Sequence, residues 1–153
     1  GVQALDLVGR KLPQDGGKAL MGFFGLVRDF IRANEDDEGL KTDFLAPLKT
    51  GSKHLQAAAE YFVSAGMKSP DNALAGSTDF LHLFGHVAIG LQWAQMAKAA
   101  LAGIARGDDP AFYRAKLATG RYYMARELPA TRMLLARIHT GAEPVMALDP
   151  EAF

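Results

Sequence analysis

The sequence predicts an all-α protein. Apolar residues recur at helical spacing along nearly the whole chain, and no run alternates β-branched with polar residues as a strand would. Prolines, glycines and polar stretches divide this pattern into four main helices with short to medium connections. Such a succession is typical of an antiparallel four-helix bundle, here with an extra short N-terminal helix and an irregular C-terminal tail.

Two helices are expected in the first 33 residues. A short apolar stripe forms the first helix, and Pro13 and the glycine pair that follows it end the pattern. The members of this stripe are Ala4, Leu5 and Val8. The second helix is expected over residues 18–33, where the apolar face is wide and partly aromatic. That face consists of Leu20, Phe23, Phe24, Val27, Phe30 and Ile31.

The third helix is expected after a polar, acidic stretch at residues 34–43, which predicts a surface loop. Thr42 or Asp43 can cap this helix, which tolerates Pro47 in its first turn. Gly66 is expected to end it. Its apolar stripe consists of Leu48, Leu55, Ala59, Phe62 and Val63.

The longest helix is expected after a turn-rich connection at residues 67–78, which has room for one helical turn after Pro70. Ser77 or Thr78 can cap the helix, and Gly107 is expected to end it. Its apolar face consists of Phe80, Phe84, Val87, Leu91, Ala94, Leu101 and Ile104.

The last helix is expected to begin at Asp109 and Pro110, a capping residue followed by a first-turn proline. Pro129 should kink this helix because a proline inside a helix removes a hydrogen bond and clashes with the preceding turn. Gly141 is expected to end it, and residues 142–153 form the irregular tail. Its apolar positions are Tyr113, Leu117, Gly120, Met124, Leu128, Leu134, Leu135 and Ile138.

Composition limits the possible functions. The 153 residues are 49% hydrophobic, which suits one domain with a core, and 17 basic residues balance 17 acidic ones. This balance provides no net field to attract nucleic acid, so no nucleic-acid partner is expected. Cysteine is absent, which excludes disulfides and thiolate metal sites. Asp6 and Arg10 interrupt the first apolar stretch, so no export signal is expected and the predicted location is the cytoplasm.

The most apolar region, residues 80–105, is long enough to span a bilayer. Five polar side chains would then lie in the hydrocarbon, so the sequence predicts a buried helix and no transmembrane segment. These side chains are His82, His86, Gln92, Gln95 and Lys98.

A metal-binding bundle is one alternative function. Asp79, His82 and His86 fall at i, i+3 and i+7 and therefore share one helix face, a spacing that can bind zinc or iron. Structural histidines at the rim of the bundle are the simpler interpretation. The sequence contains no Glu-x-x-His pair for a di-iron site and no metalloprotease motif.

No catalytic residue is expected in this chain. Cysteine is absent, the serines lie in no nucleophile motif, and the glycine-rich phosphate loops are missing. The outer face of the last helix is basic, which predicts either a solvated face or, as a further alternative, a module that binds acyl-CoA or a membrane surface. The basic residues are Arg114, Lys116, Arg121, Arg126, Arg132 and Arg137.

The opening stretch, GVQALDLVGRKLP, resembles the segment that directly follows the Tyr-Glu-Gly-Thr-Asn signature near the end of the catalytic fold in the acyl-CoA dehydrogenase family. The later stretches look like the C-terminal helical domain added in the long branch of this family, which includes 3-methylthiopropanoyl-CoA dehydrogenases. They are DGGKALMGFF, SPDNALAGSTDFLHLFGHVAIGLQWAQMAKAAL, DPAFYRAKLATGRYYMARELP and VMALDPEAF.

The resemblance implies that residues 1–12 are the end of a catalytic-fold helix and that residues 13–153 are a C-terminal helical bundle domain. It implies a parent enzyme that uses FAD to α,β-dehydrogenate acyl-CoA thioesters, forms a homo-oligomer and passes electrons to electron-transfer flavoprotein. The base of that reaction is the Glu of the signature, which would precede this chain. The chain itself is therefore expected to be inactive alone, to bind no FAD, and to pack against the catalytic body or a neighbouring subunit. Gly1 and Gln3 are the positions that the resemblance places near the adenosine side of FAD.

Overall fold

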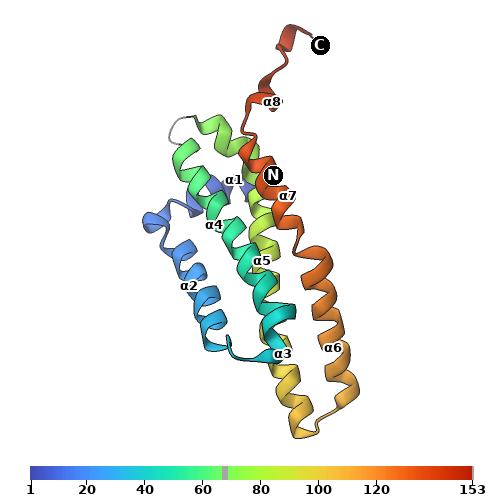
Figure 1. Cartoon of the computed structure of the whole chain (residues 1–153). Coiled ribbons are helices and arrows are strands. Elements are labelled where there is room, and N and C mark those ends of the chain that lie inside the picture. The colour runs from blue at the N-terminus through green and yellow to red at the C-terminus, as the bar shows by residue number, and fades with distance from the viewer. Residues whose placement is uncertain (67–68, 153) are drawn as a thin grey trace.

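The computed structural model of the protein describes residues 1–66 and 69–152 (Figure 1). These residues are helical nearly throughout and contain no strand, which confirms the all-α prediction. In this part of the chain, no helix combines the length and the apolar character that crossing a membrane requires.

The described elements are α-helices and shorter π or 3-10 segments. The α-helices are α1 (Val2–Asp6), α2 (Lys18–Ala33), α3 (Glu38–Leu40), α4 (Ala46–Gly66), α5 (Pro70–Arg106), α6 (Pro110–Tyr122), α7 (Ala130–His139) and α8 (Glu143–Met146). The π segments are η1 (Leu7–Lys11), η3 (Lys41–Leu45) and η4 (Tyr123–Glu127), and the 3-10 segments are η2 (Gln14–Gly17) and η5 (Pro150–Ala152). The longest helix, α5, has 37 residues.

The core forms where α5 packs against α4 and against both α6 and α7. α6 and α7 follow one another along α5, so they act as one broken rod (Figure 1). Burial of the apolar stripes of these three rods is the main force that holds them together. The largest fully buried side chains include Phe44, Leu48, Leu55, Phe80, Leu83, Val87, Leu128 and Ile138.

The helix α2 lies beside this core, with α4 as its main helical neighbour (Figure 1). Its bounds match the predicted range of residues 18–33. Val27 is its one buried residue, whereas Met21 and Leu26 are 65% and 64% exposed. The four-helix arrangement is therefore not confirmed: three rods make the core, and α2 covers part of one side.

The predicted start of the longest helix is wrong. α5 begins at Pro70 with Ser69 in the N-cap position, so residues 70–78 are helical and are not a turn-rich connection. Proline fits the first turn because the N–H that it lacks would have no partner there. Met67 and Lys68, which belong to the same predicted connection, lie outside the described residues.

Ser77 and Thr78 are consequently interior residues of α5 and not caps. The Ser77 hydroxyl donates to the carbonyl of Leu74 at 2.8 Å, so it is satisfied within the helix. Gly76 allows the ring of Phe62 to pack directly on α5, since a Cβ at this glycine would lie 3.1 Å from the ring. This tertiary contact favours helix where the local sequence suggests a turn.

The predicted loop at residues 34–43 is shorter than expected. Asp37 is the N-cap of α3, and its carboxylate accepts a hydrogen bond from the N–H of Gly39 at 2.9 Å. Thr42 and Asp43, the predicted caps, lie instead inside the π segment η3 that leads into α4. The earlier start is favoured because α3 and η3 already bury apolar side chains in the core.

Four predicted helix boundaries are confirmed. Gly107 ends α5 in the left-handed conformation, with φ of 83°, and Gly141 follows α7 with φ of 67°. Asp109 caps α6 by accepting a hydrogen bond from the N–H of Phe112 at 3.1 Å. Pro129 separates η4 from α7, as expected of a proline that interrupts a helix.

The C-terminal tail contains more regular structure than predicted. The short helix α8 and the 3-10 segment η5 occupy part of residues 142–153. They extend away from the body beyond the end of α7 (Figure 1).

Candidate functional site

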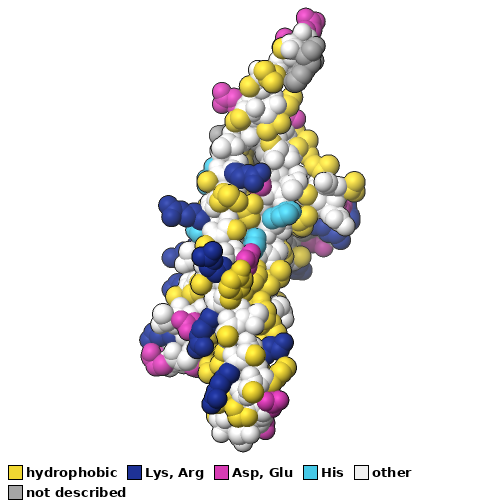
Figure 2. Space-filling view, turned by 90° about the vertical axis from the view of Figure 1, so that its right-hand side faces the viewer, with side chains coloured by type: hydrophobic (Ala, Val, Ile, Leu, Met, Phe, Trp, Pro, Cys, Tyr) yellow, Lys and Arg dark blue, Asp and Glu magenta, His cyan; other side chains and the backbone are white. Residues whose placement is uncertain are grey.

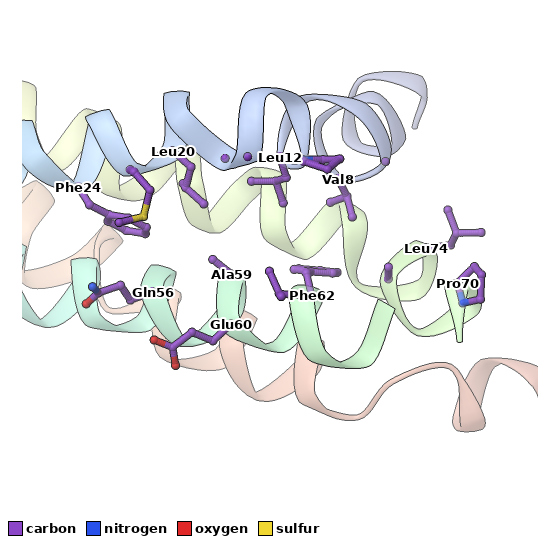
Figure 3. Close-up of a pocket in the computed structure, with 17 residues that line it drawn as sticks. Val8, Leu12, Leu20, Phe24, Gln56, Ala59, Glu60, Phe62, Pro70 and Leu74 are labelled. Carbon is purple, nitrogen blue, oxygen red and sulfur yellow. The ribbon is translucent and has the colours of Figure 1, made fainter. Parts of the chain in front are cut away.

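An apolar groove lies between the N-terminal part of the chain and α4 (Figure 3). It has a volume of about 870 Å³. η1, η2 and α2 provide one wall, and α4 and the first turns of α5 provide the other. The apolar side chains that line it are Val8, Leu12, Pro13, Leu20, Met21, Phe24, Ala59, Phe62, Val63, Pro70, Ala73 and Leu74.

A left-handed turn positions the first wall. Asp15, Gly16 and Gly17 have φ values of 50°, 66° and 78°, so the chain changes direction between η1 and α2. Glycine adopts this conformation readily, and aspartate is among the few other residues that do. Because η1 packs against α5, the turn places α2 alongside α4 and leaves the groove between them.

Few side chains in the groove could take part in a chemical reaction. Among the described residues that line the groove, Gln56 and Glu60 of α4 are the polar side chains, and none is His, Ser, Thr, Lys or Arg. General acid–base catalysis needs a donor and an acceptor near the reacting atoms, and nucleophilic catalysis needs an activated nucleophile. The groove is therefore suited to hold apolar surface and not to perform a reaction.

The predicted metal residues Asp79, His82 and His86 line one small hollow between α5 and α7 but do not form a metal-binding group. An Asp79 carboxylate oxygen lies 3.3 Å from a guanidinium nitrogen of Arg137 on α7. His82 is exposed, and His86 contacts Tyr123 of η4. Among the described residues, no group of three or more His, Cys, Asp or Glu side chains could hold a metal ion. The arrangement does not favour the metal-binding alternative.

His86 and Tyr123 form a link between α5 and η4. The Tyr123 hydroxyl donates to the backbone carbonyl of His86 at 3.0 Å and lies 3.2 Å from Nδ1 of the same residue. Since the hydroxyl hydrogen points to the carbonyl, Nδ1 must donate in the second contact. Burial lowers the pKa of His86, although the negative charge of Glu127 acts in the opposite direction. Burial also raises the pKa of Tyr123 to about 12. Both rings are thus neutral at pH 7, as expected of a structural link.

A second histidine link joins α4 to α7. Nδ1 of His54 lies 2.9 Å from the hydroxyl oxygen of Thr131, and this hydroxyl donates to the carbonyl of Leu128 at 2.8 Å. Burial lowers the pKa of His54, and the charge of Arg132 lowers it further. Sequence analysis missed this link because its partners are 77 residues apart and neither belongs to a local motif.

The predicted basic face is present on the side formed by α6 and α7. Figure 2 shows Lys and Arg side chains spread along the length of this side, with histidines between them. Two of the cations pair with acids of other elements: Arg121 lies 2.6 Å from Asp43, and Arg137 pairs with Asp79. A spread of cations that partly serves ion pairs between elements does not favour an acyl-CoA or membrane-surface site.

The two positions expected near FAD lie at the start of α1. Gly1 and Gln3 are both exposed. Neither lines the groove, and neither lines the smaller hollow of about 350 Å³ between α5 and α7. Two exposed residues form at most one edge of a flavin site, so no step of flavin chemistry is assigned to them.

Sequence analysis missed the groove because it depends on the separation of α2 from α4. The available signal was the wide apolar face predicted for residues 18–33. A helix with more apolar surface than its neighbours cover leaves part of that surface open for another contact.

Comparison with known proteins identifies the family. The family model described as "Acetyl-CoA dehydrogenase C-terminal like" matches residues 23–149. A 3-methylmercaptopropionyl-CoA dehydrogenase of Ruegeria pomeroyi is 33% identical over 131 residues, which are 83% of this chain and 22% of that protein. The broad-specificity linear acyl-CoA dehydrogenase FadE5 of Mycobacterium tuberculosis is 30% identical over 160 residues, which are 99% of this chain and 26% of that protein. The chain thus spans about a quarter of the length of these curated relatives.

The all-α fold and these matches define a C-terminal helical domain of the acyl-CoA dehydrogenase type. The chain belongs to the acetyl-CoA dehydrogenase C-terminal-like family. The resemblance based on sequence motifs is therefore confirmed. The family model begins at residue 23, so most of the first groove wall precedes the matched region, whereas the α4 and α5 wall lies inside it.

Proposed function

We propose that this chain is the C-terminal domain of an FAD-dependent acyl-CoA dehydrogenase and acts in it as a packing module. In this proposal, the domain packs against the catalytic body, against a neighbouring subunit, or against both, and it has no dehydrogenase activity alone. One observation carries the proposal: two proteins named as acyl-CoA dehydrogenases match most of this chain with about a quarter of their own length.

The surface of the domain supports a packing role. The groove is apolar, and Met21 of α2, which lines it, is 65% exposed. Apolar surface removed from water contributes about 25 cal/mol per Å² to association before the costs of ordering are subtracted. A contiguous exposed apolar region of this kind marks an interaction surface.

The proposed boundary between the catalytic fold and the bundle lies between residues 12 and 13. Residues 1–12 would complete the last helix of the catalytic fold, and residues 13–153 would form the bundle. Two observations support this division: the left-handed turn at residues 15–17 interrupts the helical path, and the family model begins shortly afterwards, at residue 23.

The remaining parts of the proposal concern the parent enzyme. FAD, when bound there, supplies the hydride acceptor for α,β-dehydrogenation of the acyl-CoA thioester, and electron-transfer flavoprotein receives the electrons. Gly1 and Gln3 would contribute only at the adenosine side of the cofactor. The parent would be a cytoplasmic homo-oligomer.

Expression of the 153-residue chain alone tests the proposal. The purified chain should fold as a helical domain, show no flavin absorbance after incubation with excess FAD, and oxidise no acyl-CoA. A full-length relative treated in the same way is the positive control. Stoichiometric flavin on the isolated chain, or turnover of any acyl-CoA, would overturn the proposal.

A chimera tests the packing role separately. In the Ruegeria pomeroyi relative, the matching region would be replaced by this chain or deleted. The replacement should retain the oligomeric state and thermal stability of the parent, and the deletion should lower both. Equal stability and the same oligomeric state in the deletion would refute the packing role.

A further inference from the structure

The helix α2 is attached to the core from its second turn onward but not at its N-terminal end. Val27 is 1% exposed, and the ring centroid of Phe23 lies 4.8 Å from that of Phe84 on α5. At the C-terminal end, the carboxamide nitrogen of Asn34 donates to a backbone carbonyl of the last turn at 2.6 Å. Among the described side chains that form the core or pack against it, none comes from residues 18–22. The N-terminal end of α2 is therefore its least restrained part.

A turn that can change its direction at low cost connects this end to η1. Asp15, Gly16 and Gly17 are three successive left-handed residues, and one backbone hydrogen bond, from the N–H of Gly16 to the carbonyl of Pro13 at 3.1 Å, spans the turn. Asp15 and Gly16 are exposed, and a Cβ at Gly16 would meet nothing within 4 Å. Because glycine has a wide range of backbone conformations, the two glycines allow the turn to act as a hinge.

Apolar side chains are exposed on both walls of the groove that lies beside this free end. Met21 of α2, Val63 of α4 and Leu74 of α5 all line the groove, and they are 65%, 68% and 49% exposed. Figure 3 shows Leu20 on one wall and Ala59 on the other, with open space between them. A tilt of α2 toward α4 would remove this apolar surface from water and improve the packing, and both changes are favourable.

We infer that residues 18–22 of α2 form a lid over the groove. The structure has the lid in its open position. In the closed position, α2 tilts about its buried contact at Val27, and the turn at residues 15–17 takes up the change in direction. Leu20 then lies against Ala59, and the groove is filled by the side chains of the lid itself.

The lid controls access to the groove, because an apolar partner surface can enter only in the open position. This inference goes beyond the proposed packing role and does not depend on it. Its test requires neither flavin nor substrate, so its failure would leave the dehydrogenase assignment untouched.

Distances between pairs of spin labels, measured by double electron–electron resonance, test the lid in the 153-residue chain, which has no cysteine of its own. One pair is attached at Ala19→Cys on the free end of α2 and at Ser64→Cys on α4, two exposed positions that do not line the groove. It should give two distances, one for each position of the lid. The control pair, at Arg32→Cys and Lys49→Cys near the attached end, should give one. A single distance for the first pair, or two distances for both pairs, would overturn the inference.

Substitutions in the groove test whether closure depends on its apolar walls. Ala59→Phe fills part of the space, and Val63→Lys places a charge there, so each should lower the share of the shorter distance about fivefold or more. Ala99→Phe, at an exposed position of α5 outside the groove, is the matched control and should leave both shares unchanged. The helicity of each variant verifies its fold, and Val63→Lys changes a residue that is 68% exposed, so it does not disturb the core. Shares that neither groove substitution changes would refute the lid.

Discussion

Thr131 is a buried polar residue whose role follows from its two hydrogen bonds. Its hydroxyl donates to the carbonyl of Leu128, so the oxygen is left to accept from Nδ1 of His54. The pair connects α4 to α7 next to the break at Pro129. Such a contact fixes the relative positions of two rods at a place where the second rod is interrupted.

We predict that Thr131→Val lowers the free energy of unfolding by about 1–2 kcal/mol. The substitution keeps the shape of the side chain but leaves the half-buried Nδ1 of His54 without its acceptor. Urea denaturation of the two proteins measures the difference. Thr119→Val is the control, because the exposed hydroxyl of Thr119 bonds only to the carbonyl of Ala115 in its own helix. The prediction fails if both variants change stability equally.

The pKa values of His54 and His86 predict how stability depends on pH. Burial lowers both pKa values in the folded protein from the ordinary value of 6.5. As the pH falls through 6.5, the unfolded chain therefore takes up protons that the folded chain does not. The part of the stability that depends on these two neutral histidines should be fully present above pH 6.5. It should be lost as the pH falls from 6.5 toward the lower pKa values that the histidines have in the folded protein.

Urea unfolding at a series of pH values between about 7.5 and 5.5 measures this decline. In the double variant His54→Gln, His86→Gln, the decline over the same range should be shallower. An equally steep decline in the double variant would show that other groups cause it.

At the scale of the helices, the space around a glycine shows whether another element packs closely against the helix at that position. Gly120 of α6 is buried, and a Cβ there would lie 2.9 Å from the ring of Phe44 and 3.3 Å from that of Trp93. Phe44 is fully buried, and buried side chains are closely packed, so a shift of its ring would disturb its neighbours. At Gly85 of α5, a Cβ would meet nothing within 4 Å.

We therefore expect opposite effects from the same substitution. Gly120→Ala should lower the free energy of unfolding by about 1–3 kcal/mol through overpacking. Gly85→Ala should raise it by up to about 1 kcal/mol, because alanine is the better helix former. Thermal denaturation of both variants checks the pair. A stabilising Gly120→Ala would mean that α6 packs less closely against η3 than described.

The helices themselves were predictable where a local signal marks their ends. Gly107 and Asp109 are a left-handed stop and an N-cap, and each acts through its own backbone or side chain. The start of α5 at Pro70 was not predictable in the same way, because the local sequence around Gly76 is typical of a turn. In the folded protein, the ring of Phe62 packs on Gly76 and favours the helix. Tertiary contact decides such segments, and a single sequence does not contain that information explicitly.

At the scale of the whole molecule, stability should be unevenly distributed. α5 is packed by neighbours along its length, whereas α2 buries only Val27 and α8 buries no residue. Local opening costs least where few apolar contacts are lost. Hydrogen–deuterium exchange, measured at a concentration where the chain is monomeric, should therefore be slowest in α5, faster in α2 and fastest in α8. Protection of α2 equal to that of α5 would contradict this order.

Only part of the candidate site could be predicted from the sequence. The wide apolar face at residues 18–33 was visible in the sequence, but the space between α2 and α4 was not. That space depends on the turn at residues 15–17, whose left-handed conformation a single sequence indicates only by its two glycines. The family resemblance, in contrast, was carried by motifs along the whole chain and did not depend on the packing.

The broken rod of α6 and α7 has a consequence for how this domain can vary in length. From Leu117 to Ile138, its buried positions stay three or four residues apart, across the π segment and the proline. They are Leu117, Gly120, Met124, Leu128, Thr131, Leu134 and Ile138. One residue inserted between Met124 and Leu128 would rotate α7 by about 100° relative to α6 and turn the later positions toward solvent. Natural relatives should therefore gain and lose residues in the loop before α3 or in the tail, while the distance from Met124 to Leu128 stays constant.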